Sequence, residues 1–138
     1  MNDLVSADGL DEPAIAQLVH RFYEQVRDDA LLGPIFGARV HDWDDHMARM
    51  CRFWSSILLR TGTYQGQPMR LHQVLPIDAQ HFDHWLALFR KTAEDVLTPA
   101  GARNVIGRAE RIARNLESGV AVANGVMLGP DDRYVMRG

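Results

Sequence analysis

The chain has 138 residues, of which 46% are hydrophobic and 24% charged, with a formal net charge of −3. These values are typical of one soluble globular domain, and they argue against nucleic acid or an anionic membrane as a partner. With no apolar run long enough to span a bilayer, no basic leader and a single cysteine, Cys51, the sequence argues against a membrane span, a signal peptide, an intrachain disulfide and a multi-cysteine metal site. We therefore expect one cytoplasmic domain over residues 1–138.

Helical periodicity dominates the first half of the chain. The first helix is expected over residues 12–29, where Asp11 supplies a capping side chain and Pro13 a proline in the first turn. A turn is expected at residues 31–37, because a Gly-Pro pair breaks the pattern. The second helix follows over residues 41–59, whose apolar side chains recur at spacings of three, four and seven.

The middle of the chain has no strong period. Residues 60–77 contain several glycines and prolines, so we expect a loop with at most a short helix around residues 69–73. Asp78 then caps a third helix, and Thr98 with Pro99 begins a fourth.

Both ends of the chain also lack a helical period. Residues 1–10 and about 124–138 are expected to form frayed or extended ends. The sequence contains no internal repeat and no convincing strand. The pattern therefore predicts an all-α fold of four principal helices with one long irregular loop in the middle.

Three of the expected helices carry a hydrogen-bonding side chain on or beside the apolar stripe, and the loop adds a histidine. The helical residues are Tyr23, His46 and Trp85, and the loop residue is His72. Taken alone, each has a structural explanation as a core or surface residue. Together they describe a pocket, since burying a polar group without a partner costs about 1–3 kcal/mol. Either these groups pair with one another or a guest molecule satisfies them.

Sites built from protein ligands alone fit this set poorly. The local histidine pairs, at positions 41/46 and 81/84, lack a matching third ligand for zinc. No glutamate has a histidine three residues later, as a di-iron bundle requires. There is no Gly-x-Ser-x-Gly elbow and no glycine-rich phosphate loop. An iron porphyrin fits better, because it needs one neutral imidazole, apolar walls and a few donors.

Five segments of the chain carry a family resemblance. FYEQVR, LGPIF, WDDHMARMCRFWSSILL, YQGQPMRLH and HFDHWLALF together resemble the truncated haemoglobins, and specifically their third group. The resemblance runs in order over about residues 12–120 without large gaps. It implies a truncated globin-like two-over-two helical sandwich around haem b (iron protoporphyrin IX).

The resemblance also implies roles for particular residues. His72 matches the proximal ligand of the haem iron, and Tyr23, His46 and Trp85 match the distal residues that face a bound gas. Arg49 is expected to reach a haem propionate. The remaining residues expected to contact haem are Phe36, Met50, Phe53, Met69, Ile77, Phe82 and Phe89.

These roles imply a globin that binds O2 and other diatomic gases, including CO and NO. The hydroxyl of Tyr23 and the indole N–H of Trp85 are suitable donors to O2, which carries partial negative charge when bound. The alternatives are nitric oxide dioxygenase or peroxidase-like chemistry, and a sensor read by another protein. Any redox cycle would need a separate reductase, because the chain has no flavin or dinucleotide motif. A haem-free helical module would keep the same core pattern, but it would have no reason to keep His72.

Overall fold

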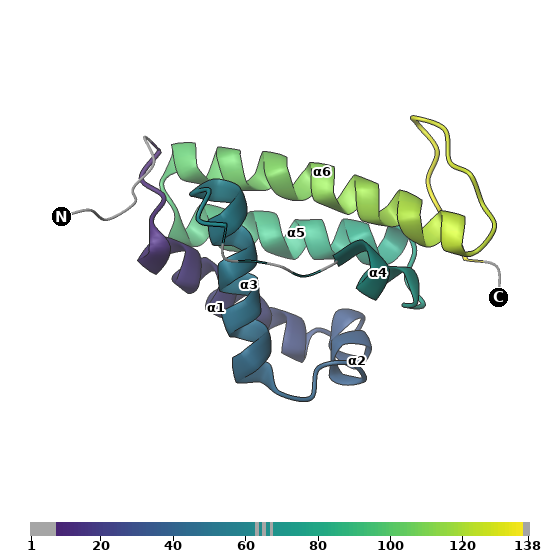
Figure 1. Ribbon diagram of the computed structural model, residues 1–138, viewed down its shortest axis with the longest axis horizontal. Helices are drawn as coiled ribbons and strands as arrows, with labels where there is room; N and C mark the ends of the chain where they lie inside the picture. Colours follow the sequence, from purple (N-terminus) through teal and green to yellow (C-terminus); the bar gives the residue numbers. More distant parts are fainter. Residues whose placement is uncertain (1–7, 63, 65, 67, 137–138) are drawn as a thin grey trace.

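The computed structural model describes residues 8–136 except residues 63, 65 and 67. These residues form six helices and no strand: α1 (Glu12–Asp28), α2 (Leu32–Gly37), α3 (Trp43–Leu58), α4 (Pro68–Gln73), α5 (Ala79–Val96) and α6 (Pro99–Ala123). α5 and α6 form a long pair, α1 packs on α5, and α3 crosses α1 (Figure 1). The result is the predicted sandwich of two helices over two. Within the described residues, no helix combines the length and apolar character needed to cross a membrane.

The four long helices begin where the sequence predicted, because each has a side chain that caps its free backbone N–H groups. The capping side chains are Asp11, Asp42, Asp78 and Thr98, which accept from the backbone of Ala14, Asp45, Gln80 and Gly101. The short helix expected within the central loop is α4, which carries His72. The expectations for residues 1–7 and 137–138 lie outside the described residues.

The prediction of a simple turn at residues 31–37 was wrong, because this segment contains the helix α2. Its first turn is capped by Asp29, whose carboxylate accepts hydrogen bonds from the backbone N–H groups of Leu31 and Leu32 at 3.0 and 2.9 Å. Pro34 lies in the first turns of this helix, where a missing N–H has little cost. The proline that suggested a break is therefore compatible with helix.

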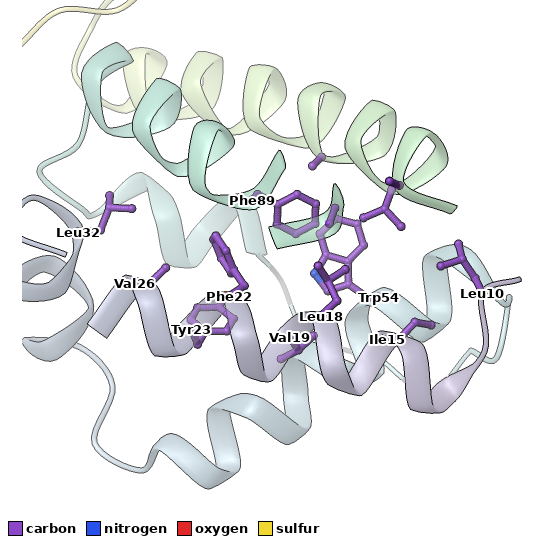
Figure 2. Close-up of a cluster of buried hydrophobic side chains, with 14 residues drawn as sticks. Leu10, Ile15, Leu18, Val19, Phe22, Tyr23, Val26, Leu32, Trp54 and Phe89 are labelled. Atoms are coloured by element: carbon purple, nitrogen blue, oxygen red, sulfur yellow. The ribbon is translucent and has the colours of Figure 1, made fainter. Parts of the chain in front are cut away.

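The principal core lies between α1, α3, α5 and α6, and stacked aromatic rings form its centre (Figure 2). Phe89 of α5 stacks on Trp54 of α3 with ring centroids 5.2 Å apart, and on Trp85 with centroids 5.1 Å apart. Phe22 of α1 meets Phe89 edge to face at 5.3 Å. Buried rings of this size stabilise the fold by about 1.5–3 kcal/mol each, so this stack fixes how α1 and α3 lie on α5.

The C-terminal segment, residues 124–136, is extended and contains no helix. It turns back beside the end of α6 (Figure 1). Tyr134 is buried there, its carbonyl accepts a hydrogen bond from the backbone N–H of Ala79 at 2.8 Å, and its own N–H donates to Glu117 at 2.8 Å. These bonds attach the described part of the segment to both α5 and α6.

Candidate functional site

His46 lies at the centre of an aromatic cluster formed by three helices. Its ring meets Tyr23 of α1 edge to face, with centroids 4.9 Å apart and planes at 88°. The ring of Phe36 from α2 lies 6.2 Å away, and that of Trp43 from α3 lies 5.6 Å away. We call Tyr23, Phe36, Trp43 and His46 the distal cluster. Two of the residues predicted to face a ligand, Tyr23 and His46, are therefore neighbours.

The Nε2 atom of His46 is buried and has no hydrogen-bond partner within the described part of the chain. Burial, and secondarily the positive charge of Arg49, lower the pKa of this imidazole. The ring is therefore neutral near pH 7. An unpartnered buried nitrogen of this kind costs about 1–3 kcal/mol, a penalty that a polar guest in the cluster would remove.

Tyr23 presents a phenol to the same cluster. Only 5% of its surface is exposed, because Phe22 and Phe36 pack against it with ring centroids 5.0 and 5.7 Å away. Burial raises the pKa of this hydroxyl far above its ordinary value. The phenol therefore keeps its proton at every physiological pH and remains a hydrogen-bond donor.

His72 lies on α4 with a fixed tautomer. Its Nδ1 atom is 2.7 Å from the carbonyl oxygen of Pro68, four residues earlier. A carbonyl can only accept, so Nδ1 carries the proton and Nε2 keeps a lone pair. Burial lowers the pKa of this ring, although the bond to Pro68 opposes that effect. A neutral histidine oriented through its other nitrogen is the usual form of a metal-binding imidazole.

The two histidines come from different helices and lie within electrostatic reach of one another. Protonation of one ring would disfavour protonation of the other, a minor contribution to the lowered pKa of His46 after burial and Arg49. One ring comes from α3 and the other from α4. This arrangement brings a potential metal ligand and the distal cluster to one region of the fold.

Trp85, the third predicted distal residue, reaches the cluster indirectly. Its indole stacks on Phe89 and meets Phe22 edge to face, with centroids 5.4 Å apart. Phe22 in turn contacts Tyr23. The structure therefore joins Trp85 to the cluster through Phe22.

The other predicted haem contacts on α3 occupy different surroundings. Met50 and Phe53 are half-buried against the principal core, and Phe53 also meets Tyr64 edge to face at 5.1 Å. Arg49 is exposed and forms an ion pair with Asp45 at 2.6 Å. Its charge nevertheless acts on the neighbouring His46.

The remaining predicted contacts lie away from the distal cluster. Ile77 and Phe82 belong to a second buried group together with Tyr134. Phe89 lies between two tryptophan rings in the principal core. Met69 packs against Gly119 of α6, where an added Cβ would come within 2.0 Å of its sulfur. This close approach seats α4 on α6 and thereby positions His72.

Sequence reasoning did not assign Trp43, which meets His46, or Arg27, which covers Trp43. Trp43 belongs to the apolar pattern of residues 41–59 but was not predicted to line the site, and Arg27 was not predicted to contribute to it. The Cζ atom of Arg27 lies 4.6 Å from the centroid of the Trp43 ring. The spacing of three residues between Trp43 and His46 was the available signal, because it places both on one helix face.

The donor set is consistent with haem and with no simpler metal centre. Among the residues that the structure describes, no group of three or more His, Cys, Asp or Glu side chains could hold a metal ion. A single histidine is sufficient for haem, because the porphyrin supplies the other four nitrogen ligands. The lone pair on Nε2 of His72, and the Nε2 of His46 that has no partner among the described residues, both fit that cofactor.

Known proteins share the sequence and fold over most of the chain. Residues 7–117 match the bacterial-like globin family. The chain is 35% identical over 114 residues to the group 3 truncated haemoglobin of Campylobacter jejuni, an alignment covering 79% of this chain and 90% of that protein. The crystal structure of a group III truncated haemoglobin from Campylobacter jejuni matches with a TM-score of 0.75 at 34% identity, covering 82% of this chain and 93% of the other.

A second solved structure gives the same architecture at a greater distance. The group II 2-on-2 haemoglobin from Agrobacterium tumefaciens matches with a TM-score of 0.66 at 26% identity, covering 85% of this chain and 95% of the other. The family match at residues 7–117 includes α1 to α5 and most of α6. The chain belongs to the bacterial-like globins and is similar to the group III truncated haemoglobins, a membership that implies a haem cofactor and a gas-binding role.

Proposed function

We propose that this chain binds haem b through the Nε2 atom of His72 and holds O2 beside Tyr23, His46 and Trp85. The observation that carries the proposal is the pair of neutral histidine nitrogens described above. The bond from Nδ1 to Pro68 leaves a lone pair on Nε2 of His72, and Nε2 of His46 is buried with no partner in the part of the chain that the structure describes. When bound, haem supplies an iron whose remaining coordination position accepts a diatomic gas.

The chain's own contribution is to hold donors in a dry site. The buried Tyr23 hydroxyl keeps its proton, so it can donate to the negative charge that O2 gains on binding. The surrounding rings of Phe36 and Trp43 exclude water, which strengthens any hydrogen bond formed there. Several donors favour slow release of O2, a property better suited to scavenging than to bulk transport.

The same polar cluster supports a second candidate function, the oxidation of nitric oxide by O2 or peroxidase-like cleavage of an O–O bond. A buried phenol donor beside a neutral histidine would assist either reaction. Each requires a separate reductase for repeated turnover. Mixing the oxygenated protein with nitric oxide and a reductant distinguishes the candidates: nitrate formed over many cycles indicates an enzyme, and nitrate formed once indicates a binding protein.

Replacement of the axial ligand tests the main proposal. His72→Gly should take up haem poorly, and added imidazole should restore the ferrous and CO spectra in part, because imidazole fills the space left by the side chain. His20→Ala, an exposed histidine on α1, is the matched control and should leave the spectra unchanged. Loss of haem in His46→Ala together with a normal spectrum in His72→Gly would reverse the two assignments. A native protein that shows no Soret band after reconstitution would refute haem binding.

A further inference from the structure

The aromatic rings that surround His46 differ in how deeply they are buried. Tyr23 belongs to the principal core, whereas Phe36 and Trp43 are only half-buried. Trp43 is the first residue of α3 and lies one turn before His46, with their ring centroids 5.6 Å apart. The half-buried rings of Phe36 and Trp43 are therefore the part of the enclosure nearest to solvent.

Trp43 is in turn covered from α1. Arg27 lies in the last turn of that helix and places its guanidinium over the indole, with Cζ 4.6 Å from the ring centroid. A cation over an aromatic face is attracted to it, and at an exposed position this attraction shifts a local equilibrium about two- to fivefold. Arg27 thus ties the end of α1 to the start of α3 at the ring that meets His46 edge to face.

We propose that Arg27 and Trp43 form a latch that holds His46 in its enclosed position and thereby limits how fast gases reach and leave the pocket. Neither residue is among those proposed to face the ligand, so we treat both as positioning residues that act through His46. The inference rests on the proposed function, because it concerns the access of gas to the same site. Because Nε2 of His46 has no hydrogen-bond partner among the described residues, packing of the surrounding rings contributes to holding the imidazole in place.

A latch and a ligand donor have different kinetic effects. A donor such as Tyr23 stabilises the bound gas and slows its dissociation alone. A latch changes the fraction of time for which the path is open, so it changes association and dissociation by the same factor and leaves the equilibrium constant almost unaltered. The two roles can therefore be separated by measuring both rates.

The experiment uses ferrous protein with CO and O2 as probes. Flash photolysis would be compared for the native chain, Arg27→Gln, Arg27→Lys, Trp43→Leu and the double variant Arg27→Gln/Trp43→Leu. Arg27→Gln removes the charge and should raise association of both gases and dissociation of O2 about two- to fivefold. Arg27→Lys keeps a cation but not the flat guanidinium, so its effect should be smaller. In the Trp43→Leu background, Arg27→Gln should cause no further change in either rate, because the arginine acts through the Trp43 ring.

A spectroscopic readout tests the latch independently of ligand kinetics. The surrounding rings shift the imidazole proton resonances of His46, and Arg27→Gln should move these resonances towards their free values. The measurement applies to the diamagnetic CO complex and to the haem-free chain, so a failure of haem binding would not prevent it. Failure of the proposed function would appear as a native chain without a Soret band, which is a different result from failure of the latch.

Arg21→Gln is the matched control, since it makes the same change of charge at an exposed position on the same helix. It should leave the rates and the His46 resonances unchanged. The latch is refuted if Arg27→Gln behaves like Arg21→Gln in both measurements. It is also refuted if Arg27→Gln changes only O2 dissociation, or if its full effect persists in the Trp43→Leu background.

Discussion

Single residues in the distal cluster have properties that come from burial. Tyr23 is enclosed so completely that its hydroxyl cannot lose a proton near neutral pH, and His46 is enclosed without a partner for Nε2. His72 is half-buried, but its orientation is fixed by a bond to its own helix. Each of these three groups is thereby held in a single protonation state. For Tyr23 and His72, the atom that carries the proton is also known. Such fixed donors and acceptors discriminate between ligands that differ in charge.

Substitution of the predicted distal donors tests this discrimination. Tyr23→Phe or Trp85→Phe should speed O2 dissociation roughly 10- to 150-fold, because each would remove a charge-assisted hydrogen bond worth about 1.5–3 kcal/mol. CO accepts little charge, so its dissociation should change much less. Stopped-flow measurements on both gases would give the comparison.

The double variant shows whether Tyr23 and Trp85 donate to the same ligand. Competing donors would give less than the sum of the single effects. Trp85 is stacked on Phe89, so a role in packing alone predicts similar shifts for O2 and CO together with lower stability. That outcome would remove Trp85 from the ligand site and leave it as part of the core.

At the scale of secondary-structure elements, α2 is held in place by its junction with α1. Asp29 caps α2 and also lies 2.5 Å from Nε2 of His84 on α5. Gly33 approaches the end of α1 so closely that an added Cβ would lie 2.9 Å from the carbonyl oxygen of Arg27. Because α2 carries Phe36, these contacts determine where one wall of the distal cluster lies.

The Asp29 junction should make stability depend on pH in the acid range. Burial alone would raise the pKa of Asp29, but hydrogen bonds from His84 and from two backbone N–H groups outweigh burial and lower it. A folded pKa below the unfolded value means that the carboxylate stabilises the fold above about pH 4. This contribution is lost as the pH falls through the folded pKa.

The measurement is the free energy of unfolding by urea for native protein and Asp29→Asn. The native protein should be the more stable at pH 5, and the difference should shrink as the pH is lowered below about 4. Asp28→Asn, an exposed neighbour, is the control. A difference that stays constant down to pH 2 would show that the negative charge of Asp29 has no role.

Gly33→Ala tests the close approach of α2 to α1. The added methyl group would press on a backbone oxygen, so α2 must shift, and overpacking of this kind costs about 1–3 kcal/mol. Gly37→Ala is the matched control on the same helix, because its Cβ would meet nothing within 4 Å. Thermal unfolding of both variants gives the comparison. Equal stability of the two variants would mean that α2 can shift away from α1 without a loss of stability.

At the scale of the whole molecule, the C-terminal segment joins elements that are distant in sequence. Arg133 donates to the buried carboxylate of Glu117 on α6 at 3.0 Å and to Asp83 on α5 at 2.7 Å. The two acids differ in burial, since the side chain of Glu117 is 6% exposed and that of Asp83 is 59% exposed. The buried contact should therefore account for most of the stabilisation.

Substitution of each acid separates the two contacts. Glu117→Gln should lower the free energy of unfolding by about 1–3 kcal/mol, because it weakens a charge-assisted bond in a buried place. Asp83→Asn should change it by less than about 1 kcal/mol, since exposed ion pairs contribute little. Urea unfolding gives both values. A larger loss for Asp83→Asn than for Glu117→Gln would contradict the assignment.

The long helices could be predicted from the sequence because their determinants are local. The apolar period and the capping residues Asp11, Asp78 and Thr98 act within a few positions, and the structure confirms the helices they begin. The short helix α2 could not be predicted in this way. Its proline and glycine resemble turn signals, and its stability depends on the Asp29 cap and on close contact with α1.

The candidate site shows the same difference between local determinants and tertiary contacts. The sequence alone determined that Tyr23 and His46 lie on inward faces, because helical spacing fixes the face of each residue. Only the tertiary structure decided that Arg27 covers Trp43, that Phe89 lies between two tryptophans, and that Arg133 meets Glu117. These contacts depend on the angle at which α3 crosses α1 and on the return of the chain end to α6. The spacing of residues along one helix specifies neither this crossing angle nor the path of the chain end.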